Sequence, residues 1–336
     1  MCYYLYAHNY MKINYLSIYL GLFLCVVSCS PTQDKNTEPT PTVGFLDFIQ
    51  DPTIELAKNG FFDALASKGF SEKDSTIKVV YSNAQGDIPT LNQACDFILS
   101  KHPTLIATNI TLPTITAIQR TEKIPVFMMV APRPDLAGLT NEKGLAPKNL
   151  FGVYETLDYI DTAVVLINQL MPSAKRIGTV YNQSEPQSQD AFDVLQKKCK
   201  ELGLELISLP VNNSSEAQLV TQALLNKKID AFFALPDNVI FAAFETVVKS
   251  CDEANVPVFT SEAGLVSRGA LASFGADFYQ WGYDTGLQAA WFLKTKHVRD
   301  LKPAIVSKRI KLYNTKVAER YGIKPDSTFQ TYTPNR

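Results

Sequence analysis

The chain has 336 residues and a mass of 37.3 kDa, enough for two domains of ordinary size or one large one. Its residues are 46% hydrophobic and 19% charged, so the chain can bury substantial cores, and this composition excludes a disordered protein. Lys and Arg number 32 against 33 Asp and Glu, and the net charge of −1 argues against nucleic acid as a partner.

The first segment has the pattern of an export signal. Residues 15–28, YLSIYLGLFLCVVS, are apolar. Fourteen helical residues cover only about 21 Å, short of a bilayer core of about 30 Å. Lys12 precedes this run and small or polar residues follow it, which predicts a signal peptide over residues 1–28. Met1 and Met11 both fit as the start of the protein.

The end of this segment, Val-Val-Ser followed by Cys29, resembles a bacterial lipobox. The resemblance implies that diacylglycerol is attached to Cys29 and that the chain is cleaved before it; an ordinary secretory signal with an incidental cysteine is the alternative. Residues 30–42 contain three prolines and no large apolar residue, so we expect residues 29–42 to form a lipid-anchored spacer. The protein is then extracytoplasmic and held to a bacterial membrane by lipid only.

Short apolar runs alternate with helical segments through the rest of the chain. The runs predict ten strands, at 43–48, 77–82, 104–108, 124–130, 149–154, 176–182, 204–210, 229–236, 256–261 and 270–274. The segments between them predict helices at 53–68, 88–100, 112–121, 157–170, 187–202, 214–226, 239–254 and 278–294. Apolar strands joined by helices indicate parallel sheets covered on both faces.

The alternation repeats, because four strand–helix units run from Val43 to Val130 and four more from Arg176 to Ser261. We therefore expect an α/β protein of two doubly wound parallel-sheet lobes, joined by a hinge of several strands that the C-terminal part crosses. The expected ranges are 43–153 plus about 276–300 for the N-lobe, 154–275 plus about 301–325 for the C-lobe, and 326–336 for a tail.

Several segments resemble a known family. They include NAQGD at residues 83–87, SRGA at 267–270 and FYQWG at 278–282, within a match from about 43 to 323. In these the chain resembles the substrate-binding lipoproteins of bacterial ABC importers, in particular the tryptophan and aromatic-amino-acid receptor-like branch. The resemblance implies a type I periplasmic-binding-protein fold, an ABC permease as partner and no enzymatic activity. A ligand-binding sensor component with the same fold is the alternative.

Three loops depart from the family pattern. Arg133-Pro134-Asp135 replaces an Asp-Pro pair, Glu185-Pro186-Gln187-Ser188 replaces Glu-Ala-Asn-Ser, and Ser261-Glu262 replaces Ser-Asp. All three lie in predicted pocket loops, so the ligand of the family does not transfer directly.

The candidate site is the cleft between the lobes, because ligands bind beyond the carboxyl ends of strands in open parallel sheets. The loop with Thr108, Asn109 and Thr111 leads into a helix whose free N–H groups favour a carboxylate, although Thr111 is equally suited to cap that helix. On the facing lobe, Asp237 fits either a ligand ammonium or a helix cap, with Glu185 as a second candidate.

The expected ligand is a small zwitterion or carboxylate with an apolar or aromatic side chain. Phe48, Tyr154 and Tyr181 are candidates to wall that side chain, but Phe48 fits the core and Tyr154 the hinge equally well. The remaining candidate residues of the predicted pocket loops are Gln50, Asn182, Asn238 and Glu262.

Catalytic patterns are scarce. The sequence contains no nucleophile elbow, zinc-protease motif, Walker A motif or dinucleotide fingerprint. Its three histidines are His8, His102 and His297; His102 precedes a proline at the sheet edge opposite the cleft, and His297 lies in a connector. We expect no catalytic residues, no metal and no cofactor.

Overall fold

The computed structural model describes residues 39–333. The predicted signal peptide, the lipidation residue Cys29 and most of the spacer lie outside the described residues. Within the described part, no helix combines the length and the hydropathy that crossing a membrane requires.

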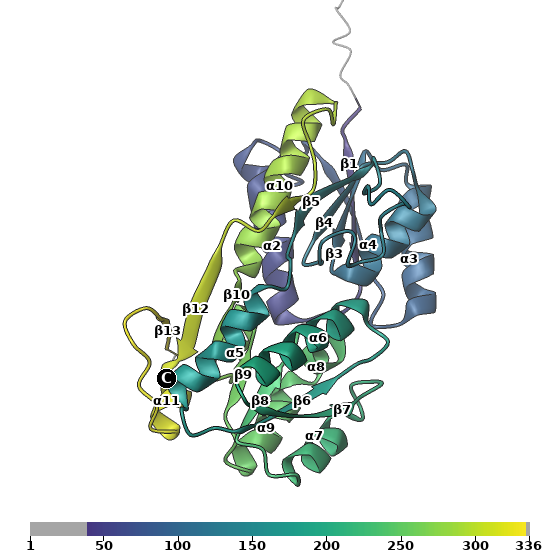
Figure 1. Ribbon diagram of the computed structural model, residues 1–336. Helices are drawn as coiled ribbons and strands as arrows, with labels where there is room; N and C mark the ends of the chain where they lie inside the picture. The colour runs from purple at the N-terminus through teal and green to yellow at the C-terminus, as the bar shows by residue number, and fades with distance from the viewer. Residues whose placement is uncertain (1–38, 334–336) are drawn as a thin grey trace, which may run out of the picture. The chain divides into compact units, whose positions relative to one another are not determined.

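The first lobe is built on a six-stranded sheet in the order β11-β5-β4-β3-β1-β2 (Figure 1). Its strands are β1 (Thr42–Asp47), β2 (Lys78–Asn83), β3 (Leu105–Asn109), β4 (Val126–Met129), β5 (Leu150–Tyr154) and β11 (Ala304–Ile305). All neighbouring strands pair in parallel. The apolar runs predicted this arrangement, since β1 carries Val43, Phe45 and Leu46 with no exposed surface at all.

Helices cover both faces of this sheet. One face carries α3 (Ile88–Ser100) and α4 (Thr111–Arg120), and the other carries α2 (Pro52–Ser67) and α10 (Phe278–Thr295). The helices α2 and α10 pack with their backbones nearly touching. A Cβ atom added to Gly282 would lie 1.8 Å from the carbonyl oxygen of Ala57, and one added to Gly60 would lie 2.0 Å from that of Tyr279. The second and third turns of α2 are thus shaped for a helix more than 200 residues later in the chain.

The second lobe repeats the same winding. Its sheet has the order β13-β12-β10-β9-β8-β6-β7, from the strands β6 (Arg176–Tyr181), β7 (Glu205–Pro210), β8 (Ala231–Ala234), β9 (Val258–Thr260), β10 (Ala272–Ala276), β12 (Arg309–Asn314) and β13 (Gln330–Tyr332). The run β7-β6-β8-β9-β10 repeats the order β2-β1-β3-β4-β5 of the first lobe, and only β12 pairs antiparallel, with β10. The predicted two-lobed, doubly wound parallel architecture is therefore confirmed.

The helices of the second lobe lie on both faces of its sheet. They are α5 (Tyr159–Leu170), α6 (Pro186–Glu201), α7 (Ala217–Leu225), α8 (Asn238–Ala242), α9 (Phe244–Glu253), the 3₁₀ turn η1 (Ala263–Val266) and α11 (Thr315–Arg320). The helix predicted at 239–254 is in fact two, α8 and α9, separated at Ala243. The backbone leaves the helical region there, with φ −110° and ψ 14°.

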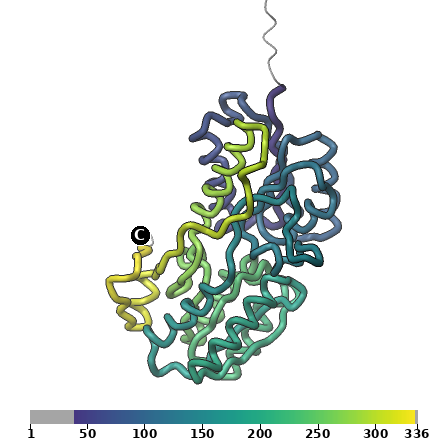
Figure 2. Tube along the Cα trace, turned by 45° about the horizontal axis from the view of Figure 1, so that its top comes forward, coloured from purple at the N-terminus to yellow at the C-terminus, as the bar shows by residue number. Residues whose placement is uncertain are grey.

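Three connections join the lobes, and Figure 2 shows the chain passing between them. They run from β5 to α5, from β10 to α10 and from β11 to β12. Two short strands pair with a part of the fold other than the one to which the predicted lobe ranges assigned them. β11 lies in a range expected for the C-lobe and pairs with β5 of the first sheet, and β13 lies in the expected tail and pairs with β12.

Candidate ligand-binding cleft

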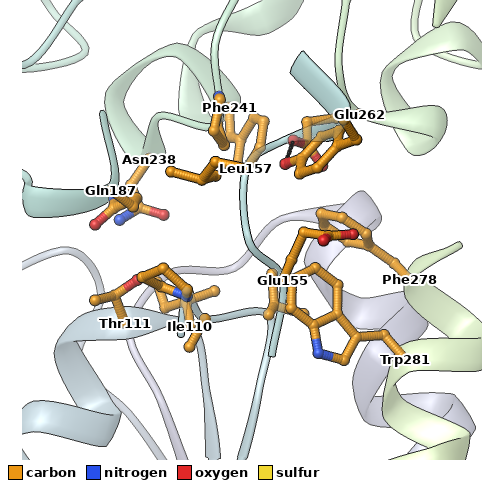
Figure 3. Close-up of a pocket in the computed structure, with 15 residues that line it drawn as sticks. Ile110, Thr111, Glu155, Leu157, Gln187, Asn238, Phe241, Glu262, Phe278 and Trp281 are labelled. Atoms are coloured by element: carbon orange, nitrogen blue, oxygen red, sulfur yellow. Dashed lines mark hydrogen bonds between the residues drawn. The ribbon is translucent and has the colours of Figure 1, made fainter. Parts of the chain in front are cut away.

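A pocket opens between the two lobes, directly against the hinge (Figure 3). It encloses about 420 Å³ of space between atoms, part of it open to solvent. Loops that follow β3, β4 and β5 line it from the first lobe, and loops that follow β6, β8 and β9 line it from the second. The pocket thus occupies the carboxyl ends of the strands in both sheets, where open parallel sheets bind ligands.

Strained backbone marks this pocket. Ile110, Val130 and Leu157 have positive φ angles of 69°, 51° and 67°, which branched or bulky residues rarely adopt. All three line the pocket. The other non-glycine residues with positive φ in the described part are polar, so every apolar residue there with a positive φ lines this pocket. Such strain persists only where the surrounding structure imposes it, and it is commonest at binding and catalytic sites.

One end of the pocket is polar and neutral. There α4 begins with Ile110 and Thr111, and no side chain caps its first N–H groups. Gln187 and Asn238 of the second lobe lie opposite (Figure 3). Both are at least nine-tenths buried, and the Gln187 Oε1 and Asn238 Nδ2 atoms have no hydrogen-bond partner among the described residues. An uncapped helix start facing a buried amide donor is suited to a carboxylate.

The orientation of the Gln187 amide follows from its neighbour. Its Nε2 atom donates a hydrogen bond of 2.5 Å to Glu185 Oε2, so Oε1 is the atom left without a partner. The same carboxylate oxygen accepts the backbone N–H of Asn238 at 3.0 Å. Glu185 therefore holds the side-chain amide of Gln187 and the backbone of Asn238 from behind the pocket.

The other end of the pocket holds two buried carboxyl groups, Glu155 and Glu262, each 1% exposed. Arg309 neutralises Glu155 with two hydrogen bonds, of 2.9 Å from Nε and 2.5 Å from Nη2. Glu262 has no such cation; its Oε1 accepts hydrogen bonds of 2.9 Å from the hydroxyls of Tyr159 and Ser261. Burial, with a smaller effect of the Glu155 charge, raises the pKa of Glu262 to about 7.

Aromatic side chains complete the wall between the two ends. Phe278 and Trp281 project from the start of α10 and pack edge to face, with ring centroids 5.8 Å apart. The Trp281 indole N–H donates to the carbonyl oxygen of Val153 at 2.7 Å, which fixes the ring. Phe241 of α8 faces them from the second lobe. The middle of the pocket is therefore suited to a flat, apolar group.

Three of the twelve residues predicted from the sequence as ligand contacts line this pocket: Thr111, Asn238 and Glu262. Asp237 lies beside it and is occupied as a helix cap. It accepts the backbone N–H of Asn182 at 2.6 Å, that of Ile240 at 3.0 Å and the Ser188 hydroxyl at 2.5 Å. From the sequence, Asp237 fitted either a helix cap or a partner for a ligand ammonium, and in the structure it caps α8.

The other predicted residues also lie outside the lining. Thr108 and Asn109 are fully buried; the Thr108 hydroxyl bonds to that of Thr114, and Asn109 Nδ2 donates to the carbonyl oxygen of Ile54. Tyr181 stacks on Phe192 at 4.2 Å. The remaining five are also absent from the lining: Asn182, Glu185 and Phe48 are buried, Gln50 is exposed and Tyr154 is half-buried.

Sequence reasoning missed most of the aromatic wall. It did not propose Trp281, Phe278, Phe241 or Gln187 as ligand contacts. The signal was present in part, since FYQWG at residues 278–282 was among the most specific segments of the resemblance. Within residues 39–333, no group of three or more His, Cys, Asp or Glu side chains is arranged to hold a metal ion.

A second contact between the lobes lies outside the pocket. Arg268 of the second lobe donates from Nη1 to Asp51 Oδ2 at 2.5 Å, and Asp51 caps α2 of the first lobe through its other oxygen. Arg268 also holds Glu245 with two hydrogen bonds and the carbonyl oxygen of the pocket residue Phe241 at 2.8 Å. The Arg268 and Asp51 side chains are 9% and 1% exposed, so the pair is buried.

Comparison with known proteins identifies the family. Residues 42–332 match the family described as ABC transporter substrate binding protein. The chain belongs to this family. Among curated proteins it is 33% identical, over 276 residues, to the "Tyrosine-binding protein" of Clostridioides difficile (strain R20291), a match that covers 82% of this chain and 79% of that protein. It is thus a member of an extracytoplasmic substrate-binding family with the type I periplasmic-binding-protein fold.

Two solved structures are each 26% identical to this ABC substrate-binding protein. Each alignment covers 88% of this chain and the whole of the solved chain. One is the ABC domain from Streptococcus pneumonia in complex with L-Trp, with a TM-score of 0.80. The other is the ligand-free, open structure of a substrate binding protein with adhesive properties from Clostridium difficile, with a TM-score of 0.66. The structure described here is more similar to the ligand-bound protein than to the open one.

Proposed function

We propose that this protein binds an amino acid with an aromatic side chain in the interlobe pocket and delivers it to an ABC permease. The observation that carries the proposal is the composition of the pocket. A carboxylate site at the start of α4 is separated by an aromatic wall from a buried carboxyl group. The relatives support it, since one is a tyrosine-binding protein and another was solved with L-Trp.

In this proposal the ligand carboxylate accepts hydrogen bonds from the first N–H groups of α4 and from Asn238 Nδ2. The first site belongs to the first lobe and the second to the second lobe, so one ligand group bridges both. A ligand that contacts both lobes favours their closed arrangement, and the three connections between the lobes are the natural hinge. The structural similarity to an L-Trp complex supports this.

We further propose that Cys29 carries a lipid anchor and that the protein works outside the cytoplasm without catalysing a reaction. The support is the lipobox-like sequence before Cys29 and the match to a family of solute-binding proteins. The permease would take the ligand from the cleft when the lobes open.

Calorimetric titration with L-tyrosine, L-tryptophan, L-phenylalanine and a set of sugars tests the ligand class. We expect micromolar or tighter dissociation constants for aromatic amino acids and no heat from sugars. Asn238→Ala removes one hydrogen bond to a charged group and should weaken binding about 10–100-fold. Asn226→Ala, at the end of α7 in the same lobe, is the matched control. A sugar that binds more tightly than every amino acid would refute the proposal.

A further inference from the structure

The two ends of the pocket offer different chemistry to the two ends of a ligand. The polar end has an uncapped helix start and a free amide donor for a carboxylate, and a free amide acceptor, Gln187 Oε1, for an ammonium. Each charged group of an amino-acid zwitterion therefore has a hydrogen-bond partner at this end. The side chain of the ligand then runs along the aromatic wall toward Glu155 and Glu262 (Figure 3).

Glu262 is the unused group at that far end. Both hydroxyl donors, from Tyr159 and Ser261, bond to Oε1, and no side chain or N–H group in residues 39–333 donates to Oε2. Glu155 beside it is already satisfied by Arg309. Because Glu262 lines the pocket and Oε2 has no donor within the described residues, this oxygen is free to accept a hydrogen bond from water or from a ligand when the carboxyl group is ionised.

We propose that Glu262 is a specificity-determining residue that accepts a hydrogen bond from a donor at the tip of the ligand's aromatic side chain. The matching ligand groups are a phenol hydroxyl, as in tyrosine, or an indole N–H, as in tryptophan. Phenylalanine fits the same wall but leaves Glu262 without a donor. A site built around a polar group rejects the analogue that lacks it far more strongly than a purely apolar pocket would.

The proposal rests on the proposed function, since it takes an aromatic amino acid as the ligand. It makes a separate prediction, because a site that recognises only the zwitterion and a flat ring would bind tyrosine and phenylalanine with similar affinity. It also differs from an assignment of the ligand ammonium to Glu262, under which the side-chain hydroxyl would be irrelevant.

The test is calorimetric titration of the wild type and the Glu262→Leu variant with four ligands. These are L-tyrosine, L-phenylalanine, L-tryptophan and N1-methyl-L-tryptophan. We expect the wild type to prefer tyrosine over phenylalanine, and tryptophan over its methyl derivative, by at least about tenfold. The variant should lose most of both preferences while it still binds phenylalanine. Glu205→Leu, a surface carboxylate of the same lobe, is the control. Glu262→Gln is a second variant that keeps the shape of the side chain.

The outcomes separate the two proposals. If tyrosine and phenylalanine bind the wild type equally well, the specificity role of Glu262 is wrong while the amino-acid function stands. If Glu262→Leu and Glu262→Gln weaken all four ligands by the same factor, Glu262 binds the ammonium group and the inference is again overturned. If none of the four binds the wild type, the proposed ligand class fails, and the role of Glu262 fails with it.

Discussion

The buried ion pair between Asp51 and Arg268 should set how readily the two lobes close. Asp51 belongs to the first lobe and Arg268 to the second, so opening the cleft separates them. Arg268 keeps Glu245 in either state, because both belong to the second lobe. Asp51→Asn is the cleanest perturbation, since asparagine caps a helix about as well as aspartate and α2 is left intact.

The magnitude follows from the burial of the pair. Removing one partner of a buried, hydrogen-bonded charge pair across an interface costs about 2–5 kcal/mol. An asparagine that keeps the cap with its oxygen turns its NH2 group toward the guanidinium, so the hydrogen bond between the lobes is lost; Arg268 still retains Glu245, so we expect the low end, about 2 kcal/mol. That corresponds to roughly a 30-fold weaker closing equilibrium. Because tight binding requires closure, the apparent dissociation constant for the ligand rises by up to the same factor.

Calorimetry gives the dissociation constant, stopped-flow fluorescence gives the dissociation rate, and X-ray scattering with ligand gives the fraction of closed protein. The rise should appear mainly in the dissociation rate, since the pair forms only after the lobes meet. Arg268→Gln should act in the same direction. Arg133→Gln is the control, because its pair with Asp135 is exposed and lies in one loop. If Asp51→Asn and Arg268→Gln both leave binding within twofold of wild type, the pair does not hold the lobes together.

Three further predictions concern stability and anchoring. Because the Glu262 pKa is raised from 4.5 to about 7, the fold favours the neutral acid, and the stability that this group contributes is present below pH 4.5 and is lost as the pH rises to 7. In urea denaturation without ligand, the free energy of unfolding of Glu262→Gln should therefore rise relative to wild type by up to about 3 kcal/mol between pH 4 and pH 8. A difference that stays constant with pH would contradict the raised pKa. Gly282→Ala forces α10 away from α2 and should cost about 1–3 kcal/mol by thermal unfolding; an unchanged melting temperature would show that the contact yields. Cys29→Ala should leave the protein unprocessed or soluble, and unchanged partitioning into detergent would refute the lipobox.

The sequence predicted the elements well because buried parallel strands read as continuous apolar runs. The strand predicted at 104–108 is β3 at 105–109, and the helix predicted at 88–100 is α3 with the same bounds. The break between α8 and α9 was missed because neither glycine nor proline marks it; the helix ends at Ala243, an otherwise good helix former.

The candidate site was predicted at the level of loops and not of side chains. Asp237 and Asn238 are neighbours, yet the first turns back to cap α8 while the second lines the pocket. Which of two adjacent polar residues faces a ligand depends on cap geometry, which residue types alone do not reveal. Trp281 lines the pocket because α10 starts at a hinge connection, and that placement follows from the packing of the lobes.

The contact between α2 and α10 has a consequence for how the chain folds. The first lobe is not complete after β5, because part of one sheet face and the side of α2 that contacts α10 stay uncovered until α10, more than 120 residues later, has been made. During synthesis most of the second lobe, from α5 to β10, therefore emerges before the first lobe can finish. Closing so long a loop is slow, and a fragment ending near residue 154 would expose the apolar surface that α10 covers. The two lobes are separate in architecture but depend on each other during folding. The connections that form the hinge also delay the completion of each lobe until part of the other has been synthesised.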